Sequence, residues 1–205
     1  MTDQKRRGYF EKILCLDAET SGLFFANESS DPSFNEKTGE SYQAVSWGMV
    51  VADFKTLEPI DQLYVEIQWN GESLWSDKAE AVHGLSKDHL AANGCTEEEA
   101  LVQIGEFIFR HFGDTSVCTL GHNHVRFDLP FLQTLARKFG MKFKFGNRHI
   151  DTNAIAAVCW EAFNSDELFD FAGLPEREQH NALEDIIYTL EAARRTRVLF
   201  NTAIQ

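Results

Sequence analysis

Close to its start the sequence reads Ile13-Leu14-Cys15-Leu16-Asp17-Ala18-Glu19, an apolar run that ends in two acids. A short apolar run of this kind is typical of a buried strand. Because successive side chains of a strand point to opposite faces, Asp17 and Glu19 project from the same face. Adjacent carboxylates repel each other unless a cation lies between them, and their oxygens favour Mg²⁺ or Mn²⁺ over zinc. The pair fits a metal site, although a solvated strand end has the same pattern.

Apolar patterns and capping signals predict the elements that follow this strand. Thr96 and Glu99 fit a capping box, and apolar residues follow them at helical spacing up to Gly113. Strands followed by helices that alternate with strands predict a mixed α/β sheet, which we expect to be five-stranded and flanked by helices. The remaining predicted elements are strands at 45–54, 63–69 and 117–120, a helix from 129 to before Gly140, and a helix over about 181–199 with Leu183, Ile186, Ile187 and Leu190 on one face.

The composition indicates one acidic globular domain over residues 1–205. Hydrophobic residues make up 43% of the chain, which is enough for a full core. A net charge of −13 argues against general electrostatic attraction to nucleic acid or to an anionic membrane. Any phosphate of a substrate must therefore be bound locally, by metal ions or by a small basic strip. Residues 26–43 form a polar insertion that is long for a connection between two strands.

Cysteine usage and hydropathy set the expected compartment. The four cysteines are far apart and form no C-x-x-C pair, which predicts reduced thiols in a cytoplasmic protein. We find neither a secretory signal nor a run of ~18 apolar residues, so no membrane association is expected.

Two further sites carry acids that could join the first pair. Asp128 follows the strand at 117–120 near the start of a helix, where a carboxylate can also be a simple N-cap. His180 and Asp185 are five residues apart, so they would not share one face of a regular helix. They converge only if His180 lies on the loop before the last helix and Asp185 lies on its first turns.

Together the three elements resemble the DEDDh family of 3′→5′ exonucleases, which includes polymerase proofreading (DnaQ-like) subunits, oligoribonuclease and RNase T. The resemblance covers roughly residues 13–199. Supporting stretches are Thr20-Ser21-Gly22-Leu23, Val82-His83-Gly84-Leu85 and Ile150-Asp151-Thr152. One departure is that Asn123 stands five positions before Asp128, whereas many members have Asn four positions before this acid.

The resemblance implies a ribonuclease H-like fold and hydrolysis with two Mg²⁺ ions, for which Mn²⁺ would substitute. Asp17 would bridge both ions, and Glu19 and Asp185 would complete the site of the ion that holds the attacking water. Asp128 would support the second ion. His180 would act as general base, since an ordinary histidine pKa of ~6.5 suits this role.

Other residues are candidates for contact with the substrate. Apolar side chains at Leu23 and Phe24 could pack on the terminal base, or could belong to the core. His83 could line the nucleotide pocket or simply end a short helix, and the role of Asn123 stays open. Lys142 and Lys144 lie in the basic strip 137–148, which is either a phosphate-binding surface or a charged edge strand with Phe143 and Phe145 turned inward.

The predicted activity is 3′→5′ hydrolysis of single-stranded nucleic acid with a free 3′ end, releasing nucleoside 5′-monophosphates. We expect DNA to be preferred, as in a phage-type or repair exonuclease, with an oligoribonuclease-like activity on RNA as the alternative. An acidic inhibitor or silent binding module on the same fold, and a zinc module built from Cys118, His122 and His124, are the other readings. A homodimer and a polymerase or repair partner are left open by the sequence.

Overall fold

The computed structural model describes residues 10–23, 34–35, 40–177 and 179–203. Its central sheet has the strand order β5-β4-β1-β6-β7. Strand β4 is antiparallel to both β1 and β5, whereas β6 is parallel to β1 and β7, so the predicted mixed five-stranded sheet is confirmed. The strands are β1 Lys12–Thr20, β4 Ala44–Asp53, β5 Pro59–Glu66, β6 Val117–Gly121 and β7 Phe145–Asp151.

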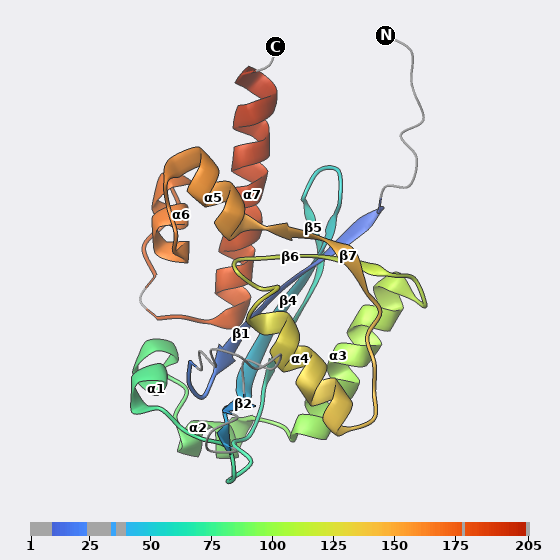
Figure 1. Cartoon of the computed structure of the whole chain (residues 1–205), viewed down its shortest axis with the longest axis vertical. Helices are drawn as coiled ribbons and strands as arrows, with labels where there is room; N and C mark the ends of the chain where they lie inside the picture. Colours follow the sequence, from blue (N-terminus) through green and yellow to red (C-terminus); the bar gives the residue numbers. More distant parts are fainter. Residues whose placement is uncertain (1–9, 24–33, 36–39, 178, 204–205) are drawn as a thin grey trace.

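Helices cover both faces of this sheet (Figure 1). Helices α3 and α4 pack with the strands in one large apolar cluster, and α7 packs on the other face in a second cluster. The helices are α1 Asp77–His83, α2 Lys87–Asn93, α3 Glu97–Phe112, α4 Asp128–Lys138, α5 Thr152–Trp160, α6 Ser165–Phe171 and α7 Ala182–Ala203. A separate small sheet pairs β2 Phe34–Asn35 with β3 Glu40–Ser41 inside the polar insertion. Residues 26–33 and 36–39 of the insertion lie outside the described part of the chain.

The alternation of β1 decides which face carries its acids. Leu14 and Leu16 are fully buried in the cluster with α3 and α4, and Ile13 and Cys15 are fully buried in the cluster with α7. Asp17 continues the odd-numbered series, as does Glu19, so both belong to the α7 face of the strand. The sheet therefore presents its two acids toward the helix that carries Asp185.

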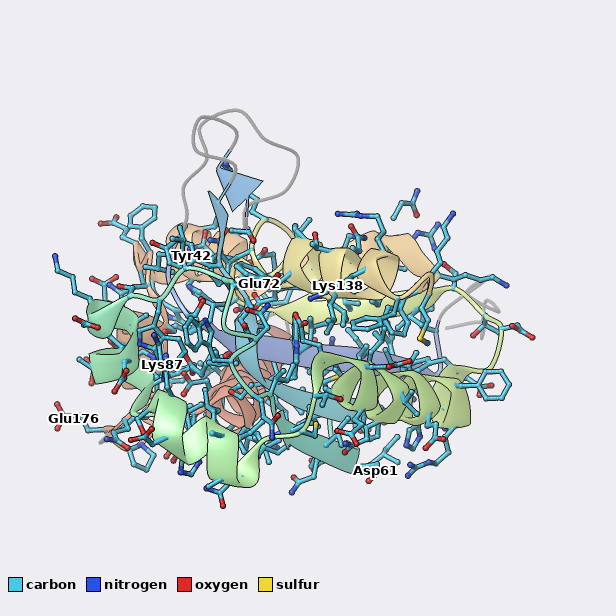
Figure 2. The ribbon with its side chains drawn as sticks, turned by 90° about the horizontal axis from the view of Figure 1, so that it is seen from below. Tyr42, Asp61, Glu72, Lys87, Lys138 and Glu176 are labelled. Atoms are coloured by element: carbon cyan, nitrogen blue, oxygen red, sulfur yellow. The ribbon has the colours of Figure 1, made fainter. Side chains whose placement is uncertain are left out.

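The predicted α3 helix is confirmed together with its cap. The Thr96 hydroxyl accepts a hydrogen bond from the Glu99 backbone N–H (3.2 Å), and the Glu99 carboxylate accepts one from the Thr96 backbone N–H (2.9 Å). Gly113 ends the helix with a positive φ of 56°. Lys138, labelled in Figure 2, pairs with Glu97 and so joins the end of α4 to the start of α3.

The structure differs from three expectations of the sequence analysis. The strand expected at 63–69 is β5 Pro59–Glu66, because the Asp53 carboxylate accepts hydrogen bonds from the backbone N–H groups of Lys55 and Thr56 and closes a tight turn. No strand begins at Lys142; β7 starts at Phe145. Ile187 does not share the buried face of α7, since it is 38% exposed. Among the described residues no helix has the length and apolarity needed to cross a membrane.

Candidate active site

The first two acids lie at the end of β1, where the strand pairs with β4. Glu19 is buried, and Asp17 is partly buried beside it. The β1–β4 pairing is regular up to Glu19 and shifts only between Glu19 and Thr20. The rigid part of the sheet therefore fixes both side chains.

Asp128 reaches the site from the start of α4. It is the first residue of the helix and is buried, while the N-cap position belongs to Phe127, whose side chain makes no capping bond. The simple N-cap reading of Asp128 is therefore wrong. A turn after β6 sets up this position, in which Asn123 has a left-handed φ of 58° and its backbone N–H donates to Asp151 Oδ1 (2.8 Å). Asparagine tolerates this conformation, which accounts for its presence here.

His180 and Asp185 converge at the start of α7, as the sequence predicts. The Asn181 side-chain oxygen caps the helix, because it accepts hydrogen bonds from the backbone N–H groups of Leu183 (3.0 Å) and Glu184 (3.2 Å). His180 lies just before this cap, and its Nδ1 is 3.2 Å from Asp185 Oδ2. Asp185 itself is buried in the first turns of the helix.

Burial and neighbouring charges raise the pKa of three carboxylates of the site. Burial and the neighbouring charges of Asp128, Glu19 and Asp185 hold the pKa of Asp17 well above its usual range. Burial and Asp185 raise the pKa of Glu19 to about 7. Burial likewise raises the pKa of Asp128, although hydrogen bonding from its own backbone N–H and from that of Ala18 opposes the shift. Burial and the mutual repulsion of these acids therefore favour a bound cation at the site.

These residues fit a divalent cation. Ligand atoms of Glu19, His180 and Asp185 all lie within 4.8 Å of one another. Asp17 and Asp128 add two more carboxylates that couple electrostatically to this group. A set dominated by carboxylate oxygens suits a hard ion such as Mg²⁺ or Mn²⁺.

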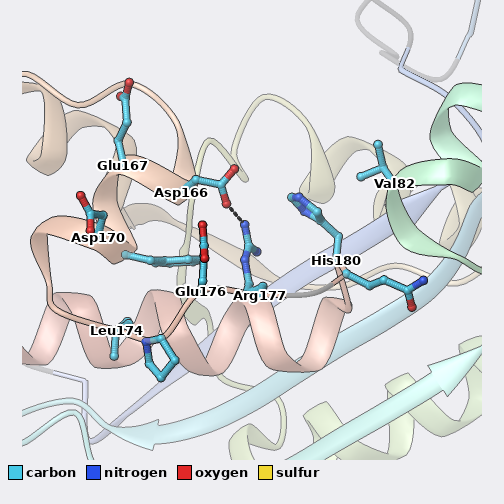
Figure 3. Close-up of a pocket in the computed structure, with 11 residues that line it drawn as sticks. Val82, Asp166, Glu167, Asp170, Leu174, Glu176, Arg177 and His180 are labelled. Carbon is cyan, nitrogen blue, oxygen red and sulfur yellow. Dashed lines mark hydrogen bonds and ion pairs between the residues drawn. The ribbon is translucent and has the colours of Figure 1, made fainter.

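A pocket of about 790 Å³ opens beside His180, between α6 and the start of α7 (Figure 3). Its wall combines apolar side chains such as Val82 and Phe169 with Arg177 and four acids. The acids that line it are Asp166, Glu167, Asp170 and Glu176.

The substrate candidates near β1 have different surroundings. Leu23 is 65% exposed, as an apolar side chain that packs on a base would be. His83 ends α1 before Gly84 and is buried, and burial lowers its pKa. Asn123 is exposed on the turn before α4. Phe24 lies outside the described residues.

The structure does not bring Lys142 and Lys144 to the acids. Both are exposed, with Phe143 and Phe145 packed toward the core, so the predicted alternation is confirmed. However, they precede β7, which runs parallel to β6 and starts level with Val117. Since β6 is in turn parallel to β1, with Leu14 level with Thr119, the lysines lie toward the opposite end of the sheet from Asp17 and Glu19.

The residues of the zinc reading have other partners. Cys118 is buried in the apolar cluster with α7, His124 Nε2 lies 2.8 Å from Thr119 Oγ1, and His122 Nδ1 lies 3.1 Å from Thr152 Oγ1.

One residue of the site escapes prediction from the sequence. Arg177 forms ion pairs with Asp185 and with Asp166, and its side chain is only 4% exposed. It lies between two glutamates in a loop sequence, Glu176-Arg177-Glu178, where an arginine is most simply read as solvated. No local pattern distinguishes it.

The mixed sheet and its flanking helices are of the ribonuclease H-like type, and the acids gathered at the end of β1 include a group that could hold a metal ion. Residues 14–193 match the family model RNase_T, described as exonuclease, so the chain belongs to this family of DEDDh 3′→5′ exonucleases. A search of curated proteins finds no match.

Solved structures of exonuclease I share the fold. The Escherichia coli enzyme in complex with a dT13 oligonucleotide has a TM-score of 0.74 and 17% identity, over 94% of this chain and 43% of that one. A zinc-bound E. coli complex with single-stranded DNA gives 0.73 and 16%, over 92% and 40%. Exonuclease I from Methylocaldum szegediense gives 0.69 and 19%, over 91% and 40%. The chain thus spans about two fifths of the length of these structures.

Proposed function

We propose that this protein removes nucleotides from the 3′ end of single-stranded DNA in a reaction that requires Mg²⁺ or Mn²⁺. The observation that carries the proposal is the convergence of Asp17, Glu19, Asp128 and Asp185 with His180, in a site where the pKa values of Asp17, Glu19 and Asp128 are raised. Family membership supports the reaction, and the oligonucleotide complexes of exonuclease I support DNA as the substrate.

The four carboxylates would hold the two ions, which when bound would stabilise the attacking and leaving oxygens of the phosphodiester. His180 would accept a proton. Its Nδ1 faces Asp185, so Nε2 is the ring nitrogen left to receive the proton of the attacking water. The hydrogen bond to Asp185 raises the pKa of His180, which makes the imidazole a stronger base. The exposed Leu23 would pack against the terminal base.

Short RNA is the alternative substrate, and one time course separates the two. DNA and RNA oligomers of several lengths, labelled at the 5′ end, are incubated with Mg²⁺, with Mn²⁺ or with EDTA. We expect a ladder of products that shorten from the 3′ end, faster on DNA and absent in EDTA. Asp17→Asn should be inactive, whereas Glu106→Gln on the exposed surface of α3 should match the wild type. Full activity in EDTA would exclude the metal-dependent reaction, and an active Asp17→Asn would exclude this site. The pathway, a phage origin and the oligomeric state stay predictions.

A further inference from the structure

Arg177 is a buried cation at the edge of the acidic site. It lies in the loop between α6 and α7, and its guanidinium carbon is 4.7 Å from the centre of the Phe169 ring. At its inner end it pairs with Asp185, whose side chain is 9% exposed, and at its outer end with Asp166, whose side chain is 71% exposed (Figure 3 marks the Asp166 contact). One guanidinium group thus joins a carboxylate of the active site to a carboxylate at the surface.

The charge of Arg177 also acts on the two acids at the end of β1. It lowers the pKa of Asp17 and of Glu19, against the raising effects of burial and of the neighbouring acids. An arginine is stable in a buried position when carboxylates pair with it. The arrangement provides the acids with part of the positive charge that a metal ion would otherwise supply.

The surroundings of Arg177 do not suit a phosphate. Both terminal nitrogens of its guanidinium group already pair with carboxylates, and its side chain is almost fully buried. The pocket beside it carries Asp166, Glu167, Asp170 and Glu176, which would repel a nucleic-acid backbone. A role inside the protein therefore accounts for Arg177 better than contact with the substrate.

We infer that Arg177 is an internal counterion that competes with the divalent cation for Asp185 and thereby weakens metal binding. This inference rests on the proposed function. A guanidinium group and a metal ion on the same carboxylate repel each other, so each must reduce the affinity of the site for the other. Asp166 supplies the alternative acceptor, because it can keep the guanidinium group when Asp185 turns to the metal.

Two substitutions with opposite expected effects test this role in the full chain without nucleic acid. Isothermal titration with Mn²⁺ should show that Arg177→Gln binds the ion roughly tenfold more tightly than the wild type. Arg177→Lys keeps the charge and should return the affinity toward the wild-type value. Asp166→Asn removes the outer acceptor, leaves Arg177 on Asp185 and should weaken Mn²⁺ binding several-fold.

Matched controls separate this competition from a general change of charge. Asp170→Asn removes an acid one helical turn from Asp166 that lines the same pocket, and it should leave the affinity near the wild-type value. Arg110→Gln removes an arginine that pairs with Asp61 on β5, and it should do the same. Melting curves give a second readout: Arg177→Gln should melt below the wild type in EDTA and gain more than the wild type from Mn²⁺.

The outcomes distinguish this inference from the proposed function. Wild-type binding of Mn²⁺ together with equal or weaker binding by Arg177→Gln would overturn the competition and leave the metal site intact. Equal losses in Asp166→Asn and Asp170→Asn would overturn the role of Asp166. A wild-type chain that binds no Mn²⁺ would overturn the proposed metal site itself. If Arg177→Gln does not fold, the Mn²⁺ affinities of Arg177→Lys and Asp166→Asn still test whether Arg177 competes with the metal ion for Asp185.

Discussion

Gly48 on β4 lies directly opposite Asp17 on β1, and the start of α7 packs against it. A Cβ atom on Gly48 would lie 2.1 Å from the carbonyl oxygen of Ala182 and 2.3 Å from the backbone nitrogen of Leu183. Only a glycine leaves room for the backbone at this point. The close approach brings the first turns of α7, and with them Asp185, over the strand end that carries Asp17.

Gly48→Ala should therefore damage the site and the fold together. The added methyl group must displace the start of α7, so we expect the activity to fall at least about tenfold, since a displacement of about 1 Å can cost far more. The melting temperature should also fall. Gly105→Ala is the control, because a Cβ there meets only the flexible end of Met141 at 3.1 Å. Wild-type activity in Gly48→Ala would show that α7 tolerates a different position.

His180→Ala should lower turnover about 10²–10⁴-fold, because general base catalysis contributes about that much. Binding of Mn²⁺, measured by titration, should change little if the imidazole is not a ligand. His89→Ala is a suitable control, since its imidazole pairs with Glu66 (2.7 Å), which is not one of the proposed site acids. A large loss of metal affinity in His180→Ala would make His180 a ligand, and an unaltered pH profile would exclude it as the base.

Glu19 should make the metal-free protein lose stability as the pH rises from about 4.3 to about 7. Glu19 has a pKa of about 7 in the folded chain, above its ordinary value of ~4.3, so the folded state holds a proton that the unfolded state has lost. Such a group stabilises the fold at low pH, and this contribution disappears as the pH rises through the folded-state pKa.

Melting curves in EDTA test this effect by comparison with Glu19→Gln. As the pH rises from about 5 to about 7.5, the melting temperature of the variant should rise relative to that of the wild type, because the other titrating groups are common to both chains. Mn²⁺ should restore the wild type at pH 8. Parallel curves for the two proteins would contradict the raised pKa.

Neutralising Lys142 and Lys144 should weaken binding of long strands only. Both lysines lie away from the acids, so a dinucleotide bound at the site cannot contact them. The slope of log affinity against log salt should flatten by about one unit, at ~0.7 per phosphate contact on a single strand. Fluorescence anisotropy over a salt series, with dinucleotide cleavage as the control, measures this. An unchanged slope would assign the lysines to the sheet edge, where Lys144 already lies near Asp114 (3.8 Å).

The predictable parts of this protein are those fixed by short-range patterns. The capping box at Thr96 specifies the start of α3, and the alternation of β1 places Asp17 and Glu19 on one face. The spacing of His180 and Asp185 predicts that they converge only if His180 lies on a loop and Asp185 on the helix that follows, and the structure has this arrangement. The site acids could be found because they recur at the ends of predictable elements.

Tertiary contacts determine what the sequence could not reveal. Helices α1, α2, α5 and α6 have seven to nine residues each, too short for a clear periodic signal. Gly48 reads as an ordinary residue of a buried strand until α7 lies on it. Arg177 becomes part of the site because the loop before α7 brings it to Asp185.

The acids of the site come from segments that are synthesised at very different times. Asp17 and Glu19 emerge from the ribosome early, Asp128 much later, and His180 and Asp185 only with the start of α7. An unfinished chain that stops before α7 lacks the proposed base and one proposed metal ligand. The nascent protein therefore should not cleave nucleic acid during its own translation, and nuclease activity should begin only when the last helix docks on the sheet.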